Sequence, residues 1–217
     1  MKTYKGIFFD MDGVVVDSAP LWSRIIASIK GKYGLDMTVL ENNGGYELTT
    51  REAISTVLDC MGISSACLLD TIAGDIDVLY GSLLGDLAVL EPDMHRILGM
   101  LREREIPAVL VTNSSRRQAC MVMDRFSLSG YFLGMLTSDD AVRGKPHPEP
   151  YSRALELAGL SGKDALAVED SSTGAASALA AGLDCVVVSG GEGPEALPVT
   201  VVGRYGLYDF LDKSTRI

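Results

Sequence analysis

The sequence predicts an α/β protein in which a doubly wound parallel sheet is interrupted by an inserted helical block. Short apolar runs rich in β-branched residues recur along the chain, and most are followed by an amphipathic helical pattern, which is typical of parallel βαβ units. The runs are almost continuously apolar, as expected for strands covered on both faces. Only the stretch from about residue 19 to 87 departs from this alternation, because it contains helical patterns and no convincing strand.

Six strands are expected from the apolar runs. They cover residues 5–9, 107–112, 132–137, 164–169, 184–189 and, with a weaker pattern, 198–202. Amphipathic helices are expected between them, over residues 94–105, 116–126, 149–159 and 173–182. A sheet of this kind collects ligands at the carboxyl ends of its strands.

The inserted block contains three helical patterns, over residues 20–34, 49–62 and 66–84. Thr49 or Thr50 is a suitable N-cap for the second pattern, and Gly62 is a suitable glycine just beyond its end. We therefore expect two domains. Residues 1–16 and 89–217 form the α/β core, and residues 17–88 form a second, helical domain.

Composition excludes several classes of function. The 217 residues carry a net charge of −10 with a pI near 4.6 and no basic patch, so nucleic acid and anionic membranes are not expected partners. No apolar run is long enough to span a bilayer, and acids interrupt the first one too early for a signal peptide. The four cysteines lack framework spacing, which indicates free thiols and a cytoplasmic protein. A monomer is the default expectation.

Polar side chains follow four separate strands at the end where ligands collect. Asp10 and Asp12 follow the first strand, Thr112 and Asn113 the second, and the pair Glu169-Asp170 the fourth, while Lys145 lies in the loop after the third. Each has an ordinary alternative: the acids and hydroxyls could cap turns and helices, and the lysine could be solvated. Their convergence on one edge of a sheet favours a common site.

These groups suit phosphoryl transfer. The carboxylates form an oxygen-rich pocket for a hard divalent cation, for which Mg²⁺ is the natural occupant. One of Asp10 and Asp12 could attack phosphorus, and the other could protonate the leaving oxygen. Thr112, backbone N–H groups at a helix start and Lys145 would hold the transferring phosphoryl group.

The segments DMDGVVVDS, VTNSS, GKPHPEPY and VEDSSTGAASALAAG resemble the four ordered motifs of the haloacid dehalogenase superfamily. Within it the chain is similar to the β-phosphoglucomutase-like phosphatases. This implies a Rossmann-like core with an inserted helical cap that closes over the substrate. It implies that Asp10 is the nucleophile and Asp12 the acid/base. It also implies Mg²⁺ held by Asp10, the Asp12 backbone carbonyl and Asp170 with support from Glu169, and phosphate held by Thr112, Asn113 and Lys145.

The cap leaves the reaction type open. Mutases of this subfamily carry a histidine early in the first cap helix, where this chain has Trp22, and the DSxPLW pattern resembles hexose-phosphate phosphatases. The sequence therefore favours a Mg²⁺-dependent phosphatase of a small phosphorylated metabolite, a sugar or polyol phosphate, acting through an aspartyl-phosphate. A phosphosugar mutase and a non-catalytic binding protein are the alternatives. Arg51 and Trp22 are candidate substrate contacts in the cap. The alternative for Arg51 is a solvated position on a helix surface, and the alternative for Trp22 is packing in the core of the cap.

Overall fold

The computed structural model describes residues 2–42, 48–189, 194 and 197–215. Six parallel strands form one sheet in the order β5-β4-β1-β6-β7-β8. They are β1 (Gly6–Phe9), β4 (Ala108–Val111), β5 (Phe132–Leu136), β6 (Ala165–Glu169), β7 (Asp184–Val188) and β8 (Thr200–Val202). Each predicted strand is confirmed with bounds that shift by at most about two residues, which is the usual uncertainty at element ends.

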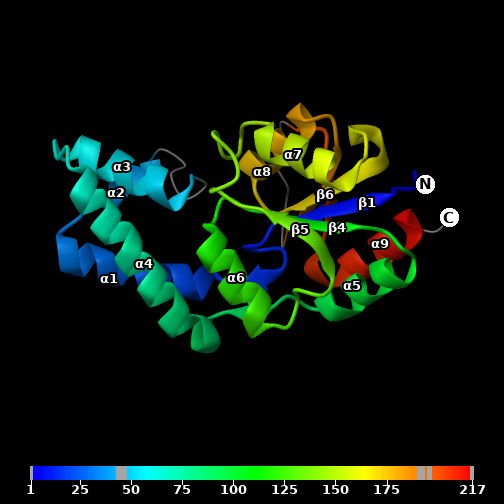
Figure 1. Ribbon diagram of the computed structural model, residues 1–217, viewed down its shortest axis with the longest axis horizontal. Helices are drawn as coiled ribbons and strands as arrows, with labels where there is room; N and C mark the ends of the chain where they lie inside the picture. The colour runs from blue at the N-terminus through cyan, green and yellow to red at the C-terminus, as the bar shows by residue number, and fades with distance from the viewer. Residues whose placement is uncertain (1, 43–47, 190–193, 195–196, 216–217) are drawn as a thin grey trace.

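Helices cover both faces of the sheet (Figure 1). One face is covered by α7 (Glu149–Ala158) and α8 (Ser172–Ala180), and the other by α5 (Met94–Glu103), α6 (Arg116–Arg125) and α9 (Leu207–Ser214). Successive side chains of a strand point to opposite faces. Accordingly, Ile7 and Phe9 of β1 join the larger apolar cluster, whereas Phe8 joins the smaller one beneath α7 and α8. Short 3₁₀ turns occupy Gly162–Asp164 and Arg204–Gly206.

In the described part of the chain between β1 and α5, four helices form a separate lobe at the left of Figure 1. They are α1 (Ala19–Tyr33), α2 (Thr38–Asn42), α3 (Thr50–Cys60) and α4 (Ala66–Leu87). The three predicted helical patterns are present, and α2 is an additional short helix. Thr49 is the N-cap of α3 and forms a capping box with Glu52, and Gly62 follows the helix with φ of +72°.

Two very short strands that the sequence did not indicate join the lobes. β2 (Val16–Asp17) pairs antiparallel with β3 (Val89–Leu90) where the chain leaves and re-enters the core. Arg204 lies 2.6 Å from Glu91 and 3.6 Å from Asp17, so one cation contacts both connections. The domain limits that the sequence predicts, near residues 17 and 88, lie at the β2–β3 pair. The division into two domains stays a prediction.

The helical lobe also touches the core directly. Gln118 of α6, which is fully buried, donates a hydrogen bond of 3.0 Å to Asp77 of α4. A side-chain carbon at Gly144 would lie 2.9 Å from the methyl group of Thr49, so the start of α3 lies against the loop that carries Lys145. Among the described helices, none is both long and apolar enough to cross a bilayer.

Candidate active site

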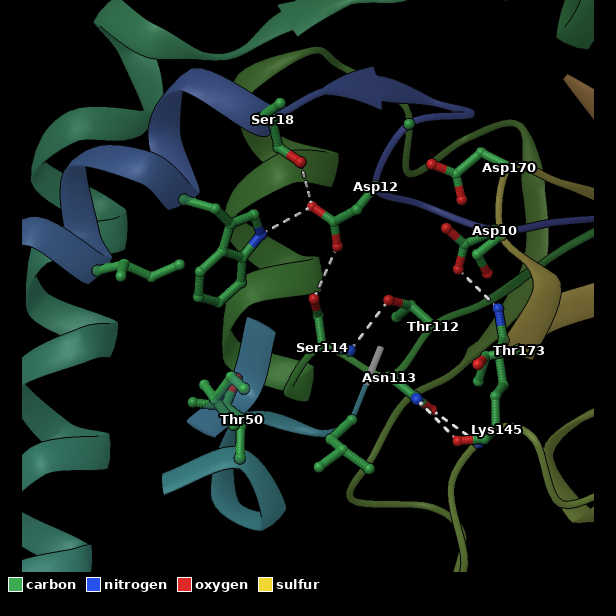
Figure 2. Close-up of a pocket in the computed structure, with 18 of the residues that line it drawn as sticks. Asp10, Asp12, Ser18, Thr50, Thr112, Asn113, Ser114, Lys145, Asp170 and Thr173 are labelled. Atoms are coloured by element: carbon green, nitrogen blue, oxygen red, sulfur yellow. Dashed lines mark hydrogen bonds and ion pairs between the residues drawn. The ribbon is translucent and has the colours of Figure 1, made fainter. Parts of the chain in front are cut away.

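Asp10, the first residue after β1, lies in a buried charge cluster. The ammonium of Lys145 donates to the Asp10 carboxylate at 2.6 Å (Figure 2). It also donates to Glu169 at 2.6 Å and to the carbonyl of Val111 at 2.7 Å. These bonds use the three N–H groups of the lysine. Burial lowers the pKa of Lys145, but Asp10 and Glu169 together raise it above its usual value, so the lysine stays charged. The sequence-predicted lysine therefore contacts the candidate nucleophile.

Glu169 and Asp170, at the end of β6, complete an acidic group beside Asp10. Carboxylate oxygens of the three residues lie within 4.8 Å of one another. Burial raises the pKa of Asp10 well above its usual value; Lys145 opposes this rise, while Glu169 and Asp170 add to it. Asp170 faces the cavity, where loss of surrounding water and the neighbouring Glu169 raise its pKa to about 7. The cluster is thus electrostatically unfavourable when all three acids are ionised.

The donors in this cluster fit a magnesium ion. All are carboxylate oxygens, which Mg²⁺ prefers in proteins. The second oxygen of Glu169 is buried and has no hydrogen-bond partner among the described residues, which is unusual for a buried carboxylate. Gly13 has φ of +80°, and a side-chain carbon there would lie 1.9 Å from an Asp170 oxygen, so only glycine leaves room for that carboxylate.

The Asp12 carboxylate points away from the acidic cluster and toward the helical lobe. One of its oxygens accepts hydrogen bonds from Ser18 at 2.5 Å and from the indole N–H of Trp22 at 3.2 Å. The other accepts from Ser114 at 2.8 Å (Figure 2). Three donors from two segments, the start of α1 and the loop after β4, therefore fix its orientation, and its side chain is outside the group of candidate metal ligands.

Thr112 and Asn113 follow β4 at the same edge of the sheet. The buried Thr112 hydroxyl accepts from the backbone N–H of Ser114 at 3.0 Å. The Asn113 amide accepts from the backbone N–H of Lys145 at 2.9 Å and donates to its carbonyl at 3.2 Å, which ties the lysine loop to β4. Ser115 then caps α6, whose N-terminus opens toward this edge.

A cavity of about 1000 Å³ connects these groups with the helical lobe. Seven of the predicted site residues line it, namely Asp10, Asp12, Trp22, Thr112, Asn113, Lys145 and Asp170. Glu169 is fully buried behind them. Arg51 is not brought to the site, because its guanidinium pairs with Asp70 at 2.6 Å on the exposed outer side of α3 and α4.

Trp22 combines the two roles considered for it. It lines the cavity, and its ring also packs edge-on against Tyr80 of α4 with centroids 5.5 Å apart. Four contacts of the site were not anticipated from the sequence: those of Ser18, Trp22 and Ser114 with Asp12, and that of Tyr151 with Glu169 at 2.5 Å. The two serines stand within motifs, but only the folded chain shows which acid they reach.

Comparisons with known proteins identify the family of the chain. A family model described as haloacid dehalogenase-like hydrolase matches residues 7–188. A protein of Thermotoga maritima named phosphorylated carbohydrates phosphatase is 25% identical over 180 residues, which cover 83% of this chain and 82% of that protein. A phosphoglycolate phosphatase of Yersinia pestis is 29% identical over 192 residues, which cover 85% of this chain and 81% of that protein.

Solved structures share the whole fold. The crystal structure of β-phosphoglucomutase from Clostridium difficile matches with a TM-score of 0.83 at 19% identity, covering 98% of this chain and 97% of that one. At that identity the likeness concerns the fold alone, including the helical lobe, and leaves the reaction to be argued from the site.

Proposed function

Because the chain belongs to the haloacid dehalogenase-like hydrolases, we propose that it is a phosphatase that forms an aspartyl-phosphate on Asp10. The observation that carries this proposal is the contact of Asp10 with the buried Lys145 beside an acidic cluster that faces the cavity. The names of the curated relatives, which are phosphatases of phosphorylated carbohydrates and of phosphoglycolate, support the same reaction class.

In the first half of the reaction an oxygen of Asp10 attacks phosphorus. The bond between phosphorus and the ester oxygen breaks, and Asp12 gives a proton to the departing oxygen. In the second half water attacks the aspartyl-phosphate, Asp12 takes a proton from that water, and inorganic phosphate leaves with Asp10 restored. Ser18, Trp22 and Ser114 hold the Asp12 carboxylate in one orientation for both proton transfers.

Asp10 and Asp170 would hold Mg²⁺, with Glu169 in support and the backbone carbonyl of Asp12 as a further ligand. When bound, the ion supplies positive charge that lets a phosphate dianion approach several carboxylates. Lys145 balances the charge of Asp10 and Glu169 from the buried side. The hydroxyl of Thr112 and the N-terminus of α6 offer donors to the phosphoryl oxygens, and Asn113 keeps the lysine loop in place.

The substrate is a small phosphate monoester. A sugar or polyol phosphate is the candidate expected from the sequence, and the name of the Thermotoga relative supports it. A mutase needs a group in the cap that positions or deprotonates the second sugar hydroxyl, which accepts the phosphoryl group from the enzyme. Within the first cap helix Trp22 reaches Asp12, and an indole N–H donates a hydrogen bond but does not accept a proton.

Phosphate release from a panel of monoesters, with Mg²⁺ or with a chelator, tests the proposal. We expect turnover only with the metal and a loss on the order of 10³-fold or more in Asp10→Asn, because an amide is a poor nucleophile. Asp124→Asn, on the exposed side of α6, is the matched control and should keep full activity. If a folded Asp10→Asn variant kept a tenth of normal activity, Asp10 would not be the nucleophile.

The same panel separates the alternatives. Hexose 1-phosphate, if accepted, should yield free hexose and inorganic phosphate in ³¹P NMR spectra over a full time course. Build-up of hexose 6-phosphate ahead of inorganic phosphate would favour a mutase. A protein that binds phosphate esters without releasing phosphate from any of them would be a non-catalytic binder.

A further inference from the structure

The cavity has two chemically different ends. Its core end is polar and carries the acids, hydroxyls and lysine of the site. Its other end is formed by the helical lobe, and we call the described lining residues between Trp22 and Ile76 the cap wall. Most of the cap wall is apolar, as shown by Trp22, Ile26, Ile29, Leu40, Ile54 and Ile76.

No charged side chain belongs to the cap wall as far as the structure describes it. Two cations line the described cavity elsewhere, and both already have acidic partners. Lys145 contacts Asp10 and Glu169, and Arg204 contacts Glu91 at 2.6 Å. A second anionic group on the substrate, such as the carboxylate of a phosphorylated two-carbon acid, would therefore meet no uncommitted cation among the described lining residues.

Hydroxyl groups are also scarce on the cap wall. Its described hydroxyls are those of Ser23 and Thr50, and Ser23 already donates to the carbonyl of Ala19 at 2.9 Å. A hexose or pentose body carries several hydroxyls, and each one buried against Ile or Leu would lose its hydrogen bonds to water without replacement. An apolar body gains from the same surface, because its transfer from water is favourable.

From these observations we propose that the preferred substrate is a phosphate monoester of a mainly hydrocarbon alcohol or phenol. The inference rests on the phosphatase function proposed above, and it replaces a sugar by an apolar body as the expected leaving group. Water is consumed, the bond between phosphorus and the ester oxygen breaks, and the products are inorganic phosphate and the free alcohol. The phosphate would sit at the polar end of the cavity and the hydrocarbon against the cap wall.

The size of the cavity agrees with a body of several carbons or a ring system. Its volume of about 1000 Å³ lies at the upper end of the range for small-molecule sites. A phosphate with a two-carbon leaving group would leave most of the cap wall without a partner. A larger apolar body would fill the space and exclude water from the bond that breaks.

Competitive inhibition by n-alkylphosphonates tests the inference without any leaving-group chemistry, because a phosphonate has no ester bond. Inhibition constants would be measured against a generic aryl phosphate for the methyl, butyl, hexyl and octyl members. Each added methylene should tighten binding by about fourfold until the cap wall is covered. A polyhydroxylated hexylphosphonate should bind more weakly than hexylphosphonate. Equal constants along the series, or tighter binding of the polyhydroxylated compound, would overturn the inference.

Binding is measurable even if no ester is hydrolysed. Trp22 is the single tryptophan of the chain and lines the cavity, so its fluorescence reports occupancy by a phosphonate directly. Length-dependent binding without phosphate release from any ester would reject the phosphatase and retain only the apolar class of ligand that the cap wall binds. Phosphate release combined with length-independent binding would retain the phosphatase and reject the apolar substrate class.

Two variants locate the effect on the cap wall. Ile26→Ser, at a partly exposed lining position, should weaken hexylphosphonate by about tenfold and leave inhibition by inorganic phosphate unchanged. Val78→Ser, at an exposed position of α4 away from the cavity, is the matched control and should change neither. Ala53→Leu, also on the cap wall, instead fills part of the cavity and should shorten the longest alkylphosphonate that still binds. Unchanged alkyl binding in both folded cap-wall variants would place the alkyl chain elsewhere and overturn the inference.

Discussion

At the scale of single residues, the two aspartates of the first motif differ in their surroundings. Asp10 lies against a buried lysine and two further acids, whereas the donors to Asp12 among the described residues are neutral. A nucleophile benefits from a fixed position beside positive charge. A proton donor and acceptor benefits from an orientation set by neutral hydrogen bonds. The separation of the two carboxylates is therefore consistent with the two proposed roles.

Asp12→Asn tests the second role. Leaving-group protonation matters most for poorly leaving alkoxides, for which general acid catalysis contributes roughly 10²–10⁴-fold. We expect a loss of that size for alkyl or sugar phosphates and a much smaller loss for an activated aryl phosphate. The check is kcat/KM for both classes in the same preparation. Equal losses would assign Asp12 to the metal or to the backbone turn.

Trp22→Phe tests whether the indole N–H positions Asp12. Phenylalanine keeps an aromatic ring against Tyr80 and removes the donor 3.2 Å from the carboxylate. Because Ser18 and Ser114 remain, we expect kcat for an alkyl phosphate to fall only about three- to tenfold, which corresponds to about 1 kcal/mol for the loss of one hydrogen bond out of three. The aryl phosphate should be little affected. A loss confined to KM for both substrates would instead indicate a purely packing role.

At the scale of elements, the start of α3 and the lysine loop approach each other closely. The α3 N-terminus is held by the capping box of Thr49 with Glu52, and Asn113 holds the loop at Lys145. Gly144 lies between them, and a side-chain carbon there would come within 2.9 Å of Thr49 and 2.8 Å of the Asn113 amide oxygen. The absence of a side chain at this position therefore permits the lobes to meet beside the site.

Gly144→Ala should disturb this contact. The added methyl group must displace either Thr49 or Asn113, which moves the start of α3 or shifts the loop of Lys145. We expect kcat/KM to fall by roughly tenfold, because small displacements of groups that position the substrate are costly for the reaction. Gly130→Ala, where nothing lies within 4 Å, serves as the control. Full activity in Gly144→Ala would show that the approach of the two segments is not needed for turnover.

At the scale of the whole molecule, one metal would connect the charges that the sheet brings together. The pKa of Asp170 is raised to about 7, so at lower pH the folded, metal-free protein retains a proton there. Magnesium must displace that proton, since a metal-ligating carboxylate is deprotonated. The affinity for Mg²⁺ should therefore increase as the pH rises through about 7.

Thermal unfolding with and without Mg²⁺ provides the measurement. The increase in Tm on adding Mg²⁺ should be larger at pH 8 than at pH 6, because at one Mg²⁺ concentration a lower Kd for the folded state gives a larger stabilisation. Protein treated with a chelator at each pH is the reference. The Asp170→Asn variant should show a smaller Mg²⁺-dependent increase in Tm at both pH values. An increase in Tm that is the same at both pH values would exclude Asp170 as the titrating ligand.

The sequence alone determined the layout of the core and the candidate groups at its edge. Continuous apolar runs separated by amphipathic patterns identified the six strands of the sheet, and all are present. This succeeds because a strand covered on both faces must be apolar along its whole length, which is a local property of the chain. The rule that ligands collect at strand ends then selected Asp10, Asp12, Thr112 and the Glu169-Asp170 pair.

Only the tertiary structure decided which of these groups touch one another and what the cap offers a substrate. The pairing of β2 with β3 brings together residues far apart in the chain through two-residue strands, which carry no periodic signal of their own. Arg51 lies outside the cavity and Trp22 reaches Asp12 because of the direction in which each helix presents its side chains. The apolar character of the cap wall depends on which faces of four helices meet. Such long-range contacts follow from packing, and no local pattern in the sequence specifies them.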